Sequence, residues 1–289
     1  GARVGYNPKK RGRRSYHPLL CFEAHRQEFW HGSLRPGNTV AATGAVPFLR
    51  VCLGKVPPGM ARSRIRVRGD ASFFGKRVVE FLDGQRVGYA LVAREYRGIK
   101  ALAQGCRFQK LRSGWEVGEF EYQPSRWQAP HRFVVVRRPI PTDPVEAKQL
   151  TLFKDTKYVY HVLVTNLRTH PWRVYRFYAL RARIEKHIRE LLYDYPLAKI
   201  PTADWIPNVA FFQLLLFAFD LVHYFKRLCL PSAYRTQTLK TVRMELLVIP
   251  GRLVNAKNRY RLKLPRGFHF QKLFQFALRK IQKLAPVQI

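Results

Sequence analysis

The segment Arg64-Ile65-Arg66-Val67-Arg68-Gly69-Asp70 alternates cationic and apolar side chains and ends on a carboxylate. This alternation predicts a β-strand, and the apolar residues from Ser72 onward predict a helix over roughly residues 73–82. Asp70 therefore stands where a strand ends and a helix is about to begin. A carboxylate in that position can hold a divalent cation, because hard cations prefer oxygen ligands. The simpler alternative is that Asp70 caps the following helix.

A second candidate carboxylate, Glu185, lies in a segment with a helical pattern. At about 100° per residue, Tyr178, Arg181 and Glu185 fall within roughly 60° of one another on one helix face. An aromatic hydroxyl, a guanidinium and a carboxylate would then lie side by side. Together with Asp70, Glu185 could hold Mg²⁺ next to a phosphodiester. The alternative is an ordinary charged helix face on which Glu185 pairs with Arg181.

Strands and helices alternate around the first carboxylate. We expect strands over residues 16–23, 29–34 and 87–93, and a helix within residues 41–53. This order predicts an α/β domain built in layers.

The pattern changes between about residues 100 and 165, where three further segments predict antiparallel strands. They are residues 115–122, 132–137 and 158–164. We therefore expect three regions: the first part of an α/β core over residues 1–99, a β-rich insertion over residues 100–170, and the second part of the core over residues 171–289. The last region would hold the Glu185 helix and a basic, helical C-terminus.

The chain is strongly cationic. It has 53 Lys and Arg against 18 Asp and Glu among 289 residues, a formal net charge of +35, and 47% hydrophobic residues. The hydrophobic content supports a folded core, and the charge favours a polyanionic partner such as nucleic acid. A turn rich in cations could bind backbone phosphates, or it could be a solvated loop; its members are Lys9, Lys10, Arg11, Arg13 and Arg14. A protein that coats RNA is the plainer interpretation of such a charge.

Two features of the sequence indicate the cellular compartment. The four cysteines are scattered, which argues against a disulfide framework or a zinc ribbon and fits a reducing cytoplasm. The apolar residues 209–225 are interrupted by Gln213, Asp220 and His223, which favours a helix buried against a sheet over a membrane span. The chain begins at Gly1 without an initiator Met, so we expect it to be a fragment.

Three parts of the sequence together resemble one known family. Tyr178, Arg181 and Glu185 match a Tyr-x2-Arg-x3-Glu-x6-Lys signature, and residues 66–73 match the segment around that family's second Asp. The openings at residues 5–20 and 34–38 also resemble one of its subfamilies. The chain is thus similar to the DDE transposases of bacterial insertion sequences, in the group with a β-rich insertion in an RNase H-like, retroviral-integrase-like fold.

The chain departs from this family at two places. The family's first Asp lies on a strand upstream of residues 5–8, whereas the first acidic residue in this chain is Glu23. Leu192 occupies the position of the signature Lys. We therefore expect the first strand of the core and its Asp to be missing, and the chain to bind DNA without cleaving it efficiently.

The resemblance implies a specific activity for the intact protein. It implies cleavage of DNA at transposon ends and strand transfer by a two-metal mechanism with Mg²⁺ (or Mn²⁺), with Asp70 and Glu185 as metal ligands and catalytic residues. It also implies that Tyr178 and Arg181 contact strand phosphates, that a homodimer acts on double-stranded DNA without a membrane, and that the protein is cytoplasmic in bacteria and associated with the nucleoid.

Three alternatives remain open: a catalytically dead DNA-binding remnant of a transposase, an RNA-binding protein, and an RNase H-type hydrolase. Trp127 could stack on a flipped base or could be a half-buried structural residue.

Overall fold

The computed structural model describes residues 1–5, 11–40, 42–140, 153–154, 157–256 and 259–284. The chain forms two compact units, and each combines segments that are distant in sequence. Unit 1 comprises Gly1–Val4, Gly12–Pro36 and Ile184–Ile289, and unit 2 comprises Gly5–Arg11 and Gly37–Arg183. We describe each unit by itself.

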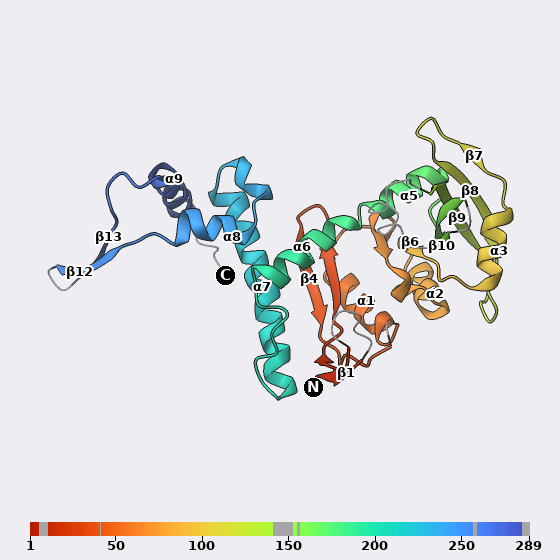
Figure 1. Cartoon of the computed structure of the whole chain (residues 1–289), viewed down its shortest axis with the longest axis horizontal. Helices are drawn as coiled ribbons and strands as arrows, with labels where there is room; N and C mark the ends of the chain where they lie inside the picture. The colour runs from red at the N-terminus through yellow and green to blue at the C-terminus, as the bar shows by residue number, and fades with distance from the viewer. Residues whose placement is uncertain (6–10, 41, 141–152, 155–156, 257–258, 285–289) are drawn as a thin grey trace. The chain divides into compact units, whose positions relative to one another are not determined.

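Unit 2 is built on one mixed sheet (Figure 1). In spatial order its strands are β5 (Arg66–Gly69), β6 (Gly88–Val92), β11 (Tyr158–Thr165), β9 (His131–Pro139), β8 (Glu116–Tyr122) and β7 (Gln109–Lys110), with β10 (Phe153–Lys154) paired to β11. β5 and β6 are parallel, and the remaining pairs are antiparallel. The sheet therefore joins a parallel α/β part to an antiparallel meander.

Helices cover both faces of this sheet. Within its described residues, unit 2 has the helices α1 (Ala45–Gly54), α2 (Lys76–Gly84), α3 (Arg97–Gly105) and α5 (Pro171–Ala179), and the short 3₁₀ turns η1 (Arg62–Arg64) and η2 (Ala71–Phe73). Side chains of α1, α2 and α3 pack on one face with Phe133 and Val135, whereas Val174 of α5 packs on the other face with Val134 and Leu163. Neighbouring residues of β9 point to opposite faces, and since both faces are buried its centre is apolar throughout.

Unit 1 combines hairpins with helices. Its strand pairs are β1 (Arg3–Val4) with β2 (Arg14–Ser15), β3 (Leu19–Glu23) with β4 (Glu28–Ser33), and β12 (Arg252–Ala256) with β13 (Arg259–Lys263). Its helices are most of α6 (Ala182–Tyr193), α7 (Trp205–Cys229), α8 (Leu239–Val242) with the π-helical turn Arg243–Leu247, and α9 (Gln271–Gln282), with the 3₁₀ helix η3 (Ser232–Thr236) after α7.

Helix α7 packs along the β3–β4 hairpin. Phe212 and Phe219 lie in a buried cluster with Phe29 of β4. Gln213 Nε2 donates to the Gly32 carbonyl at 2.7 Å, and the Phe29 amide donates to the Asp220 carboxylate at 2.9 Å. A Cβ at position 32 would lie 2.4 Å from Leu216 Cδ1 and 2.7 Å from the Phe212 ring, so any larger residue there would require these side chains to shift.

The opposite face of α7 is exposed, with Leu214 63% and Phe217 65% accessible. Among the described residues, α7 is the one helix long and apolar enough to cross a membrane, by length and composition alone. The predicted packing of this helix against a sheet is confirmed, but the helix is buried along one side only.

The sequence predicted most of these elements. The mixed α/β class is confirmed, and it is compatible with an RNase H-like fold. The strands expected at residues 115–122, 132–137 and 158–164 are β8, β9 and β11, and they extend the sheet that contains β5 and β6. The domain boundaries at residues 99 and 170, and the insertion between them, remain predictions.

Two elements were missed. Helix α3 lies at the start of the region expected to be β-rich, where no element was predicted, because it is short and carries glycines at positions 98 and 105. The predicted helical C-terminus contains α7, α8 and α9, but it also contains the strands β12 and β13, which were not predicted from the sequence. Alternate residues of β13 are cationic, whereas β12 contains one cation, Arg252; this pattern also suits a charged coil.

Candidate functional site

Asp70 lies at the carboxyl end of β5. Because β5 and β6 are parallel, their carboxyl ends meet at the same edge of the sheet, with Gly69 paired to Leu91. Asp70 Oδ1 accepts a hydrogen bond from the Ser72 amide at 2.9 Å and caps the turn η2. Its side chain is still 44% accessible. The capping role and a ligand role are thus compatible, because the cap occupies one carboxylate oxygen and leaves the other to a further partner.

One arginine lies close to this carboxylate, and two others bind backbone carbonyls. Arg181 Nη2 lies 3.7 Å from Asp70 Oδ2, and Arg94 Nε donates to the Ala71 carbonyl at 3.2 Å. Arg68 donates to the Phe177 carbonyl at 3.0 Å. Burial lowers the pKa of Arg68, and the nearby charge of Arg183 lowers it further. The Arg181 guanidinium beside Asp70 suits an anionic ligand such as a phosphodiester.

Arg68 and Arg94 were not selected from the sequence. Arg68 lies within the quoted strand, and Arg94 lies two residues after the end of β6. Only the parallel pairing of β5 with β6 brings Arg94 to the edge where Asp70 lies. The sequence shows that each of these residues is near a predicted strand, but their proximity depends on the strand order.

The expectation of one continuous helix through Tyr178, Arg181 and Glu185 is wrong. Tyr178 lies near the end of α5, Arg181 lies in the turn that follows, and Glu185 lies in the first turn of α6. The Arg181 amide donates to the Tyr178 carbonyl at 2.8 Å, a three-residue bond typical of a tight turn. The three side chains therefore do not share the face of a single regular helix.

Tertiary packing explains this break. Val174 of α5 is buried in the sheet core of unit 2, whereas Leu191 of α6 is buried with Phe219 in unit 1. A helix is stabilised mainly by the burial of its apolar face, so the two halves follow two different cores. The boundary between the units falls at Arg183 and Ile184.

The structure therefore brings some predicted site residues together. Asp70 and Arg181 are neighbours in unit 2. Glu185 is exposed on α6 in unit 1. Of the predicted basic turn, Arg11, Arg13 and Arg14 are exposed, and Lys9 and Lys10 lie outside the described residues.

The predicted carboxylates are candidate metal ligands. Within the described residues, no three His, Cys, Asp or Glu side chains gather closely enough to hold a metal ion. Asp70 offers the oxygen chemistry that Mg²⁺ prefers, and one of its oxygens accepts from the Ser72 amide. The donor type therefore fits a hard cation, and at least one further ligand beyond Asp70 is needed.

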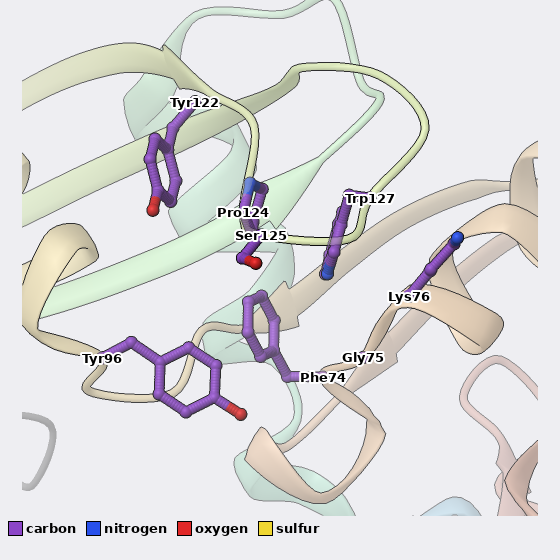
Figure 2. Close-up of a pocket in the computed structure, with 8 residues that line it drawn as sticks. All are labelled: Phe74, Gly75, Lys76, Tyr96, Tyr122, Pro124, Ser125 and Trp127. Carbon is purple, nitrogen blue, oxygen red and sulfur yellow. The ribbon is translucent and has the colours of Figure 1, made fainter.

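A cavity of about 360 Å³ opens in unit 2 near Trp127. Figure 2 shows the ring of Phe74 between those of Tyr96 and Trp127, and Lys76 at one side. The lining residues are Phe74, Gly75, Lys76, Tyr96, Tyr122, Pro124, Ser125 and Trp127.

Trp127 itself is 9% accessible, with its ring centroid 5.5 Å from that of Phe74 and 4.9 Å from that of His131. Most of this indole is therefore core, in agreement with a structural role. The stacking of Trp127 on a flipped base stays a prediction.

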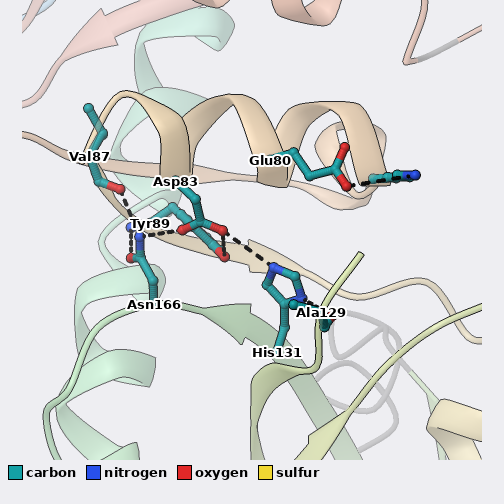
Figure 3. Close-up of polar contacts among 8 residues, drawn as sticks. Glu80, Asp83, Val87, Tyr89, Ala129, His131 and Asn166 are labelled. Carbon is teal, nitrogen blue, oxygen red and sulfur yellow. Dashed lines mark hydrogen bonds and ion pairs between the residues drawn. The ribbon is translucent and has the colours of Figure 1, made fainter. Parts of the chain in front are cut away.

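A polar network joins α2 to three strands of the sheet (Figure 3). Asn166 Nδ2 donates to Asp83 Oδ1 at 2.9 Å and to the Val87 carbonyl at 3.0 Å, and its Oδ1 accepts from the Tyr89 amide at 2.9 Å. The Tyr89 hydroxyl donates to Asp83 Oδ2 at 3.3 Å, and His131 Nε2 lies 3.3 Å from the same oxygen. Burial and the charge of Asp83 raise the pKa of Tyr89. We interpret this network as structural, because its groups are satisfied by neighbours that hold the sheet to α2.

The chain was compared with known protein families and with curated proteins. The chain matches the family described as transposase DDE domain group 1 over residues 9–286. A comparison with curated proteins found no match. Because the family match spans almost the whole sequence, the chain belongs to the transposase DDE domain group 1 family.

Proposed function

We propose that this chain is the catalytic part of a DNA transposase that cuts DNA at the ends of a mobile element and transfers the cut strands to a target. The observation that carries the proposal is the position of Asp70. It lies at the carboxyl end of β5 with Arg181 at 3.7 Å, in a chain that belongs to a DDE transposase family. Such a strand end is where open α/β sheets bind their ligands.

Asp70 and Glu185 are the carboxylates that we propose to hold Mg²⁺ or Mn²⁺. The pairing of Glu185 with Asp70 rests on the family's sequence signature. A third carboxylate is expected from the strand that the resemblance places upstream of residues 5–8. When bound, two such ions activate the attacking hydroxyl and stabilise the leaving oxygen of a phosphodiester.

The protein's own residues bind and orient the DNA strand. The Arg181 guanidinium can bind a phosphate next to Asp70 and offset the repulsion between that phosphate and the carboxylate. Tyr178, three residues earlier in the chain, has a hydroxyl that can donate to a neighbouring phosphate oxygen. Arg11, Arg13 and Arg14, together with Lys9 and Lys10, would contact the backbone without reading sequence.

We further propose the wider setting of this activity. The substrate is double-stranded DNA, at the element's ends and at the target, and the protein acts as a homodimer that pairs two ends. It works in the bacterial cytoplasm, associated with the nucleoid and not with a membrane. The core and insertion boundaries at residues 99 and 170 belong to the same proposal.

The test begins with the coding DNA upstream of Gly1. Any in-frame extension is expressed together with residues 1–289 and assayed with a supercoiled plasmid that carries the genomic segments flanking the gene. We expect nicking and strand transfer that depend on Mg²⁺ or Mn²⁺. Asp70→Asn and Glu185→Gln should both abolish them, and Glu121→Gln, which changes an exposed acid on β8, should not.

Asp70→Asn is a suitable variant because its amide oxygen can still accept the bond from the Ser72 amide. Its folding can be verified by an unchanged unfolding temperature. Activity that survives in both Asp70→Asn and Glu185→Gln would overturn the catalytic assignment. A stop codon directly upstream, together with an inactive chain that binds DNA, would instead establish the second candidate function, a catalytically dead DNA-binding remnant, which Leu192 in place of the signature Lys favours.

A further inference from the structure

The β12–β13 hairpin of unit 1 has two chemically different faces. Its strands are antiparallel, with Arg252 opposite Lys263, Leu253 opposite Leu262, and Val254 opposite Arg261. Residues directly opposite one another point to the same side, and alternate residues point to opposite sides. Arg252, Arg261 and Lys263 therefore share one face, which we call the basic face.

The hairpin projects side chains into solvent on both faces. Arg252, Arg261 and Lys263 are exposed, and on the opposite face Leu253 is 65%, Leu262 63% and Tyr260 75% accessible. The main packing partner of each strand is the other strand. A two-stranded hairpin alone is only marginally stable in water, so three exposed cations on it weaken it further unless they meet an anion.

No acidic residue follows Glu245 in the sequence. The cations of this region are Arg252, Lys257, Arg259, Arg261, Lys263, Arg266, Lys272, Arg279, Lys280 and Lys283. The last 44 residues thus carry no acidic side chain that could neutralise the basic face locally, and its charge suits an external polyanion.

The dimensions of the hairpin suit double-stranded DNA. A two-stranded β-ribbon, with strands about 4.8 Å apart, fits the major groove, which is about 12 Å wide. Arg261 and Lys263 lie two residues apart on one strand, which separates them by about 7 Å along it. Successive phosphates of one DNA strand advance about 3.4 Å each along the duplex axis, so these two cations can reach separate phosphates.

We propose that β12–β13 is a DNA-binding arm whose basic face contacts the phosphates that border a duplex groove. The inference rests on the proposed function for its ligand class, double-stranded DNA. It adds a binding element in unit 1 that is separate from the Asp70 edge and from the basic turn at residues 9–14. Phosphate contacts of this kind supply affinity and position, not sequence specificity.

The test measures how DNA binding depends on salt. The full chain is titrated against a fluorescent duplex of about 30 base pairs, with EDTA present, between about 50 and 200 mM KCl. The variant Arg252→Gln/Arg261→Gln/Lys263→Gln removes the basic face. The matched control Arg107→Gln/Lys110→Gln/Arg112→Gln removes three exposed cations near β7 in unit 2.

Loss of three phosphate contacts should lower the slope of log Kd against log salt by about 2.7 and weaken binding roughly 10- to 100-fold at about 100 mM KCl. The control should change the slope by less than about 1. The charge-conserving variant Arg252→Lys/Arg261→Lys/Lys263→Arg should restore the slope. Equal slopes for the two Gln variants would refute the proposal that β12–β13 binds DNA. The proposal would also be refuted if the chain bound an RNA of the same length more tightly than the duplex and lost that binding in the arm variant.

This experiment separates the arm from the catalytic proposal. EDTA removes divalent metal, so Asp70 and Glu185 do not contribute through metal binding. An unchanged salt slope in the arm variant would refute the DNA-binding role of β12–β13 and would leave the catalytic proposal standing. Loss of cleavage in Asp70→Asn with an unchanged slope would leave the arm unaffected. Unchanged circular dichroism and unfolding temperature show that the arm variant is folded.

Discussion

The sheet of unit 2 and the β12–β13 hairpin of unit 1 are both made of paired strands with cations near their ends, yet they differ in what covers them. The centre of β9 and β11 lies between α1, α2 and α3 on one face and α5 on the other, and Leu163 is 0% accessible. Leu262 of β13 is 63% accessible. The same strand geometry therefore builds a core in one place and an exposed surface in the other, and the covering helices make the difference.

The two units also differ in the polarity of their cores. The large cluster on one face of the unit 2 sheet is apolar and aromatic. In unit 1, the region around α7 buries His223 and Lys226 at 4% and 3% accessibility, and Lys226 donates to the Gln237 carbonyl at 2.8 Å. The stability of unit 1 should therefore depend on pH; unit 2 contains a similar histidine, His161, whose pKa burial lowers to about 4.

We expect the largest difference in the free energy of unfolding between two matched leucine variants. Leu163→Ala should destabilise unit 2 by about 2–5 kcal/mol, because it leaves a cavity among fully buried neighbours. Leu262→Ala should cost less than about 0.5 kcal/mol, because its side chain is already in water. Urea unfolding followed by circular dichroism measures both. Similar costs for the two variants would show that the hairpin is covered in solution.

Loss of the polar network of Figure 3 should lower the stability of unit 2 somewhat less than Leu163→Ala does. Asn166→Ala removes one acceptor and two donor bonds, and it leaves the Tyr89 amide and the Val87 carbonyl without this partner. We expect a loss of about 2–3 kcal/mol, measured by urea unfolding. The matched control is the exposed Asn255 of β12: Asn255→Ala should change the unfolding midpoint little. Equal shifts of the midpoint in the two variants would contradict a structural role for the network.

The pH dependence should follow two histidines of unit 1. Burial, together with the charge of Lys226, lowers the pKa of His187 and of His223 to about 4. Between pH 6.5 and 4 the unfolded chain therefore binds more protons than the folded chain does, and stability falls as the pH falls. His187 is neutral at pH 7, so its 4.0 Å approach to Glu190 is not an ion pair there.

Two acids oppose this trend. Burial raises the pKa of Asp220 to about 6, so this carboxyl favours the folded state below about pH 4 and loses that contribution as the pH rises through 6. Burial also raises the pKa of Glu190, against the opposite effect of Lys226. Burial lowers the pKa of His161 in unit 2 to about 4 as well. With three histidines acting in the same direction, we expect Tm to fall by about 2–4 °C between pH 7 and 4.5. Scanning calorimetry of His187→Gln/His223→Gln should show a smaller decrease, and an equal decrease would assign the pH response to other groups.

The smallest effect comes from a matched tyrosine pair. Tyr89→Phe removes the buried hydroxyl that donates to Asp83 and should cost about 1 kcal/mol. Tyr234→Phe removes the hydroxyl that donates to Glu245 in unit 1; burial and this bond together raise the pKa of Tyr234 to about 12. Because Tyr234 is less buried than Tyr89, the second variant should cost under about 0.5 kcal/mol. Chemical unfolding of the two proteins compares them directly, and a larger cost for Tyr234→Phe would reverse the ranking.

Local pattern was sufficient for much of the fold and for part of the site. The strand before Asp70 and the apolar centres of β9 and β11 follow from alternation or from β-branched runs, which depend on neighbours in sequence. Asp70 was selected because a strand ends there, and the structure places it at the edge shared by β5 and β6. The break between Tyr178 and Glu185 could not be predicted, because the helical periodicity continues through it.

The sequence by itself determined the family, the strongly cationic charge and the mixed α/β class, because motif spacing, charge and hydrophobic period are local or additive properties of the chain. Only the tertiary structure decided that Arg94 lies beside the Asp70 turn, that α5 and α6 are separate helices, and that Leu253 and Leu262 of β12–β13 stay exposed. Each of these depends on which distant segments bury one another. The packing of distant segments depends on the apolar surfaces of whole helices and strands, so it cannot be predicted from any short stretch of sequence.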